Sequence, residues 1–126
     1  MENQKEEEVN IASLVLPAGI LEYFTIVNTV QTHEAHHIYL NEKSLIPEEY
    51  ANDKLVSKGF YDEIKVQDFP IRGKAVFLLI KRRRWLNEST GNIVARDWEL
   101  VAKGTRMTKE FASFLKVISG YQTGKL

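Results

Sequence analysis

The residues best suited to chemistry are four consecutive cations followed by an indole: Lys81, Arg82, Arg83, Arg84 and Trp85. Guanidinium groups pair bidentately with phosphate, and an aromatic ring beside them offers a stacking surface. Strand alternation places Arg82 and Arg84 on one face, and Lys81, Arg83 and Trp85 on the other. The cluster therefore predicts contact with a polyanion, and nucleic acid is the leading partner.

The charge of the chain is divided unevenly along its length. The formal net charge is 0, but residues 1–63 hold 12 Asp or Glu against 4 Lys or Arg, and residues 64–126 hold 5 against 13. Phosphate attraction acts within a Debye length of about 8 Å at physiological salt, so a local basic surface can function on a neutral molecule. Four further cations extend the predicted basic surface: Arg96, Lys103, Arg106 and Lys109.

The sequence offers no convergent catalytic set. Asp68 and Asp97 are the best acidic candidates, but the sequence singles out no paired carboxylates and no nucleophile with a base. Asp97 could instead supply a carboxylate for an arginine. The chain has no cysteine, which excludes disulfides and thiolate metal sites. We expect no enzymatic activity, no metal and no cofactor.

A less specific interpretation stays open for each of these signals. A basic run at the end of a strand is also typical of a solvated surface or of ion-pair partners, and composition alone favours that interpretation. Trp85 and Trp98 fit core or hairpin packing better than base stacking, because indoles usually supply buried area first.

The length of 126 residues predicts one small α+β domain built on antiparallel hairpins. We expect a disordered acidic leader over 1–10, the domain over 11–118 and a flexible tail over 119–126. The domain should consist of a helix plus hairpin over 11–53 and a basic ribbon-like region plus helix over 54–118. The leader lacks a long apolar run, so the sequence predicts no secretory signal, no membrane contact and a cytoplasmic location.

In the first part, apolar spacing predicts a short helix that starts near Pro17, followed by hairpin strands over 25–32 and 36–42. A helical turn is expected after Pro47. In the second part, strands are predicted over 54–61, 63–69, 74–86 and 93–100, with turns over 70–73 and 87–92. The strand over 74–86 is apolar on both faces at its start and should be central. An amphipathic helix is predicted over 105–118, capped by Thr105 or Thr108.

Three segments resemble the amino-terminal region of bacterial insertion-sequence transposases of the DDE type. They are Asp68-Phe69-Pro70-Ile71-Arg72-Gly73-Lys74-Ala75-Val76, the arginine group ending at Trp85, and Thr105-Arg106-Met107-Thr108 before a helix. In that family an Asp-(Leu/Phe)-Pro-x-x-Gly turn leads into a strand ending in Arg-Arg-aromatic, within a zinc ribbon ahead of a helix-turn-helix. The resemblance covers about 16–118, and its specific part is 68–118. It is greatest to a cysteine-free branch encoded as a separate short reading frame.

The resemblance implies binding to double-stranded DNA at transposon ends, with the catalytic carboxylate triad on a separate chain or domain. It also implies the catalytic transposase subunit as a partner, and leaves a homodimer open. The cysteine pairs expected near 54–59 and 86–93 are absent, so the ribbon would be a degenerate one without metal. Only one helix is expected before the chain ends. Apolar packing would then replace the metal, through Phe60, Ile64, Val66, Trp85, Ile93 and Trp98.

An alternative function is a non-enzymatic protein-interaction module. Its basic face would dock on the catalytic transposase subunit, and the helix over 105–118 would supply an apolar contact.

Overall fold

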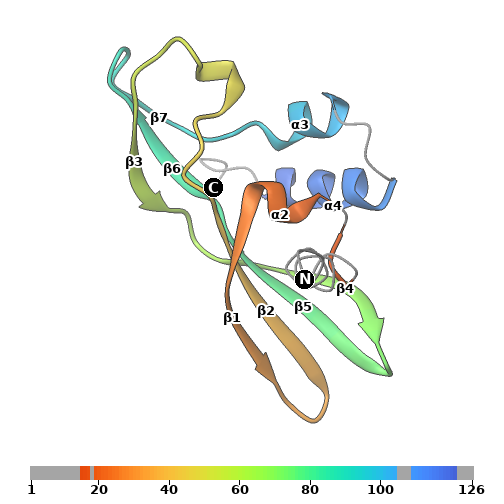
Figure 1. Ribbon diagram of the computed structural model, residues 1–126. Coiled ribbons are helices and arrows are strands. Elements are labelled where there is room, and N and C mark those ends of the chain that lie inside the picture. The colour runs from red at the N-terminus through yellow and green to blue at the C-terminus, as the bar shows by residue number, and fades with distance from the viewer. Residues whose placement is uncertain (1–14, 18, 105–108, 122–126) are drawn as a thin grey trace, which may run out of the picture.

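The computed structural model describes residues 15–17, 19–104 and 109–121, and these form an α+β fold with two sheets (Figure 1). The large sheet has the strand order β1-β2-β5-β4. Its strands are β1 (Phe24–Gln31), β2 (Ala35–Glu42), β4 (Ile64–Ile71) and β5 (Lys74–Lys81). The predicted hairpin β1–β2 and the central position of β5 are confirmed. The two hairpins of this sheet join through a parallel pair, β2 with β5, which the sequence did not predict.

The reversal between β4 and β5 is tighter than the predicted four-residue turn. Ile71 pairs with Lys74, so only Arg72 and Gly73 connect the strands. Their φ angles are 51° and 81°, the left-handed pair that a two-residue hairpin turn with two positive φ angles requires. Gly73 adopts this conformation without the steric cost that a side chain brings.

The small sheet consists of β3 (Leu55–Phe60), β6 (Arg83–Asn87) and β7 (Asn92–Val94) in the order β3-β6-β7. The prediction of one strand over 74–86 is wrong, because the chain changes sheets at Arg82. There the carbonyl of Arg82 accepts a hydrogen bond from the N–H of Tyr61 (2.8 Å), and the N–H of Arg83 donates to a carboxylate oxygen of Glu42 (2.9 Å). The Glu42 side chain thus accepts the hydrogen bond that a neighbouring strand would otherwise accept from the Arg83 N–H.

The helices are α2 (Ile20–Tyr23), the 3-10 turn η1 (Glu48–Tyr50), α3 (Trp98–Gly104) and α4 (Lys109–Ser119). The predicted strand over 93–100 is wrong beyond Val94, because a carboxylate oxygen of Asp97 accepts the N–H of Leu100 (3.1 Å) and caps a helix there. The expectation of a single helix near the end of the chain is also wrong. The proposed caps Thr105 and Thr108 lie outside the described residues.

The hydrophobic core lies between one face of the large sheet and α2, α3 and α4, which run along the same side of it (Figure 1). Trp98 is central to it: its ring stacks on Phe24, with centroids 5.1 Å apart. Strand residues in this core are Ile38, Leu40, Ile64, Val66, Val76, Leu78 and Ile80. Helix residues in it are Ile20, Phe114, Leu115 and Ile118.

The six residues expected to replace a zinc site do not form one cluster. Ile64, Val66 and Trp98 belong to the core of the large sheet, whereas Trp85 is buried on the small sheet. Ile93 is 45% exposed, so its predicted burial is wrong. The short β7 strand is the edge of the small sheet, which leaves that side chain without a covering element among the described residues.

Candidate nucleic-acid interface

Arg96 is buried beside a single carboxylate. Its Nε donates to Oε2 of Glu42 at 3.2 Å, and its Nη2 donates to the carbonyl of Leu45 at 2.8 Å. The guanidinium carbon also lies 5.1 Å from the ring centroid of Tyr23 and 5.6 Å from that of Trp98. Only 8% of Arg96 is exposed, so the expectation that it extends an exposed basic patch is not matched by its position.

Arg83 is held by the end of β2 and by β3. Its Nε and Nη2 donate to the carbonyl oxygen of Glu42 at 3.2 and 2.9 Å, and its Nη1 donates to Oγ of Ser57 at 2.6 Å. The guanidinium also lies over the ring of Phe60, 4.6 Å from the centroid. These contacts direct its donors inward and join the large sheet to the small one.

Arg82 is likewise turned into the protein. It is 7% exposed, and its Nη1 donates to the carbonyl of Tyr121, just after α4. Burial lowers the pKa of this guanidinium, which nevertheless stays protonated at neutral pH. Trp85 is 3% exposed and therefore packs rather than offering a stacking face, as the less specific interpretation predicted.

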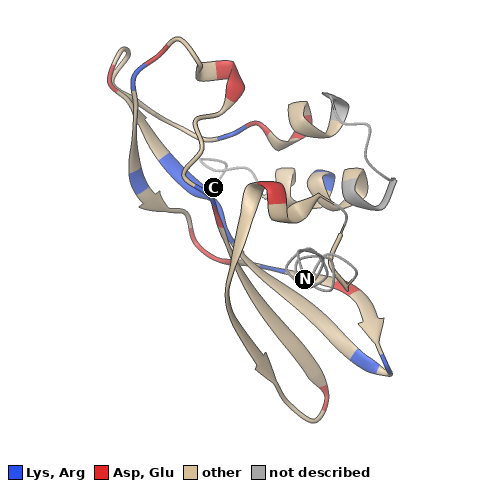
Figure 2. Cartoon of the chain, viewed as in Figure 1, with Lys and Arg blue, Asp and Glu red and all other residues tan. Residues whose placement is uncertain are grey.

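Lys81 and Arg84 are the members of the predicted cluster that face outward. Lys81 is exposed, and the half-buried Arg84 lies 5.7 Å from the ring centroid of Tyr61. Lys58, also exposed, lies on β3 in the irregular stretch between Ser57, which pairs with Trp85, and Phe60, which pairs with Arg83. Figure 2 shows cations on both strands of this pair. Sequence reasoning missed Lys58, because the pairing of the strand over 54–61 with the basic segment was not predicted. Lys103 lies on α3 and Lys109 begins α4, while Arg106 lies outside the described residues.

One carboxylate takes part in the buried contacts of this region. Glu42 accepts a hydrogen bond from the N–H of Arg83 and pairs with Arg96, and it is the one carboxylate that the described ion pairs and hydrogen bonds bring to these arginines. Asp62 and Glu63, both exposed, follow Tyr61, whose ring lies near Arg82 and Arg84. Burial raises the pKa of the Glu42 carboxyl, against the hydrogen bond from the Arg83 N–H and the charge of Arg96.

A second group of cations and rings lies on the large sheet, on the face away from the core. The Nζ of Lys65 is 4.2 Å from the ring centroid of Phe77, and that ring stacks on His37 at 5.5 Å and 29°. Sequence reasoning missed this group. The strands over 36–42, 63–69 and 74–86 were predicted, but the sequence did not show that they lie side by side.

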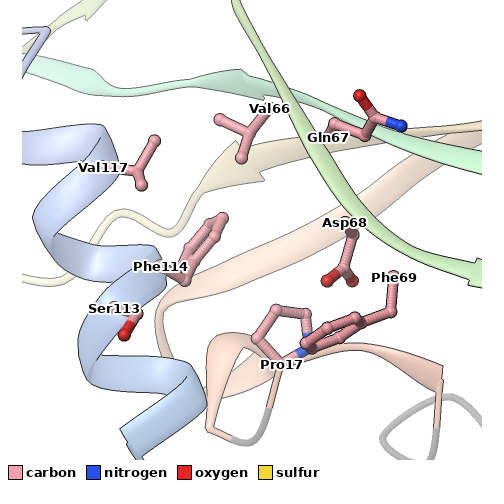
Figure 3. Close-up of a pocket in the computed structure, with 8 residues that line it drawn as sticks. All are labelled: Pro17, Val66, Gln67, Asp68, Phe69, Ser113, Phe114 and Val117. Atoms are coloured by element: carbon pink, nitrogen blue, oxygen red, sulfur yellow. The ribbon is translucent and has the colours of Figure 1, made fainter.

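A hollow opens between β4 and α4 (Figure 3). It is lined by Pro17, Val66, Gln67, Asp68, Phe69, Ser113, Phe114 and Val117. Asp68 is its one carboxylate, so the lining offers no acid–base pair. Elsewhere in the described residues, no three His, Asp or Glu side chains gather as a metal site would need.

The part of the chain that the structure describes contains no helix long and apolar enough to cross a membrane. No protein-family model, curated protein or solved structure matches the chain significantly.

Proposed function

We propose that this chain is a non-enzymatic DNA-binding component of an insertion-sequence transposase, which recognises double-stranded DNA at transposon ends. The main support is the concentration of cations where the chain changes sheets: Lys81, Arg82, Arg83 and Arg84 are consecutive, and Arg96 shares the Glu42 carboxylate with the N–H of Arg83. A positive field of this kind attracts phosphates even where individual guanidinium groups are buried. The resemblance over 68–118 supports the choice of transposon ends and of the catalytic transposase subunit as the second partner, in the cytoplasm.

The basic residues have two roles, direct contact with phosphates and support of the surface. Lys58, Lys81 and Arg84 contact phosphates, because these are the outward cations of the region. Arg83 and Arg96 hold the surface in place through Glu42 and contribute charge at a distance. The number of direct contacts is thus smaller than the cluster alone suggested.

The test is the affinity for a duplex with the terminal inverted repeats of the element, measured by fluorescence anisotropy across salt concentrations. With three phosphate contacts, log affinity falls with log salt at a slope of about −2.7. Lys81→Ala and Arg84→Ala should each make that slope about 0.9 less steep. Lys116→Ala, which removes an exposed cation from α4, is the matched control and should leave the slope unchanged.

Specificity is tested with a duplex of the same composition in scrambled order. Tighter binding to the inverted repeat supports recognition of transposon ends, and equal binding restricts the activity to non-specific contact. An affinity that does not change with salt would exclude the proposal.

The second candidate is the protein-interaction module that docks on the catalytic subunit. It is favoured by Phe69, which is 66% exposed at the rim of the hollow beside α4. Among the large apolar side chains of α4 that the structure describes, Val117 is 46% exposed, whereas Phe114, Leu115 and Ile118 are buried. Phe69→Ser should then abolish co-purification with the catalytic subunit and leave duplex binding intact, while Arg84→Ala has the opposite effect.

A further inference from the structure

The large sheet is covered on one face and open on the other. Ile38 and Leu40 of β2, Leu78 of β5, and Ile64 and Val66 of β4 all pack in the core with the helices. Alternation along a strand sends the intervening side chains to the opposite face. In the described part of the chain no helix lies on that side (Figure 1).

Three rings on this open face come from neighbouring strands. His37 is the register partner of Phe77 in the parallel pair, and Tyr39 is the partner of Leu79 one step along. The imidazole of His37 and the phenyl ring of Phe77 are stacked, with centroids 5.5 Å apart. His37, Tyr39 and Phe77 are half-buried, so each keeps part of its surface exposed.

The charged groups of this face are cations. Lys65 on β4 is the register partner of Leu79 on β5, and Lys81 on β5 is the partner of Asn41 on β2. Alternation places no Asp or Glu of the four described strands here: Glu42 is buried in the opposite direction, and Asp68 lines the hollow beside α4. The strand residues of this face are therefore aromatic and cationic, whereas the exposed Glu63, one residue before β4, lies at the Lys81 end of the face.

We infer that this open face binds the unpaired bases of a single-stranded nucleic acid. Bases stack on exposed rings irrespective of sequence, while nearby lysines follow the phosphates. The inference rests on the proposed function in that both take nucleic acid as the ligand, but it adds a second surface and a different strandedness. Single-stranded DNA is the form favoured, since the proposed function already takes DNA as the ligand.

Lys65 covers the Phe77 ring, and a base can take its place there. Its ammonium lies over the Phe77 ring at 4.2 Å, and the side chain is exposed. An exposed cation–π contact stabilises less than a stacked base does, so a base can displace the ammonium from the ring. The displaced Nζ then pairs with the adjacent phosphate, which keeps the charge satisfied.

The test uses fluorescently labelled oligothymidylate of about 12 nucleotides, within the range that one such surface covers. Phe77→Leu and Tyr39→Leu remove a ring and keep apolar bulk, and each should weaken binding by about tenfold. Tyr39→Phe keeps the ring and should bind as the unmodified protein does. Lys65→Ala should make the salt dependence less steep by about 0.7 in slope. Thermal unfolding of each variant checks that the fold survives.

Oligouridylate and duplex DNA complete the set of ligands. Ring-dependent binding to either single strand supports the inference, and tighter binding of oligouridylate assigns the ligand as RNA. Duplex binding that needs Arg84 but not Phe77, with no affinity for single strands, overturns the inference and leaves the proposed function standing. Ring-dependent binding of single strands without duplex binding supports the inference and overturns the proposed function. Binding to neither ligand overturns both.

Photo-crosslinking gives a readout that does not depend on affinity. An oligonucleotide with 5-iodouracil should form adducts at Tyr39 or Phe77. Adducts confined to the peptides with Lys58 and Arg84 overturn the assignment.

Sedimentation of Phe77→Leu tests whether the open face is an interface between two copies of the chain. A variant in which self-association changes and nucleic-acid binding does not also overturns the assignment.

Discussion

Glu42 and Arg96 form a buried ion pair between residues 54 positions apart, with Nε and Oε2 separated by 3.2 Å. Glu42 is 1% exposed and ends β2, while Arg96 precedes α3. The same carboxylate accepts the N–H of Arg83 where β6 begins. One side chain thus links the large sheet, the small sheet and the helical layer.

Glu42→Ala should lower the free energy of unfolding by about 3 to 5 kcal/mol, because it leaves the Arg96 guanidinium buried without its carboxylate. Urea denaturation followed by circular dichroism measures this. Glu88→Ala is the matched control: its pair with Lys54 spans 3.4 Å but is exposed, so the loss should stay below about 1 kcal/mol. Equal losses in the two variants would contradict the central role of Glu42.

Glu42→Gln should change how stability depends on pH. Burial raises the pKa of the Glu42 carboxyl above 4.5, so the folded chain binds this proton more tightly than the unfolded chain. The stabilisation from that proton is complete below about pH 4.5 and is lost as the pH rises through the folded-state pKa. The free energy of unfolding of the unmodified protein, minus that of Glu42→Gln, should therefore fall from pH 4 to pH 8.

Arg83→Ala and Arg84→Ala should separate stability from binding. Arg83 donates three hydrogen bonds inside the protein, so its loss should cost about 1.5 to 3 kcal/mol of unfolding free energy. Arg84 has a ring contact with Tyr61, and its loss should change stability by less than about 0.5 kcal/mol while weakening duplex binding. Denaturation and anisotropy on the same preparations test both statements, and a stable Arg83→Ala protein would refute the first.

Gly73→Ala should destabilise the protein by about 1 to 2 kcal/mol through the backbone alone. Its φ is 81°, and a Cβ there would have no atom within 4 Å, so no steric clash adds to the cost. Arg72→Asn, at φ 51°, should have the opposite sign and a smaller size, because Asn tolerates this conformation better. Melting temperatures of the two variants provide the comparison.

Asp97→Ala should cost about 0.5 to 2 kcal/mol, because Asp97 accepts the N–H of Leu100 in the first turn of α3. Asp97→Asn keeps an oxygen acceptor and should retain most of the stability. Equal losses of stability in the Ala and Asn variants would show that the cap is not the source of the loss. The hydrogen bond from the Asp97 N–H to Glu49 at 2.8 Å would not explain such losses, since both variants keep that N–H.

The local elements followed from short-range patterns. Four elements were predictable because their apolar spacing and turn residues act within a few positions of the chain. They are the hairpin before Glu42, the turn at Gly73, the central apolar strand that contains Leu78 and the amphipathic helix with Phe114. The helix that begins at Trp98 was not, because its cap residue Asp97 follows a run that also suits a strand.

The roles of the basic residues were decided by tertiary structure. The sequence by itself determined that Arg82, Arg83 and Arg84 would be concentrated at the end of a buried strand. Only the fold decided that two of them turn inward: the parallel pairing of β2 with β5 brings Glu42 to Arg83, and the end of α4 brings the Tyr121 carbonyl to Arg82. Such a contact between distant segments has no local signal. For the same reason the open aromatic face of Phe77 emerged only when three separate strands were placed side by side.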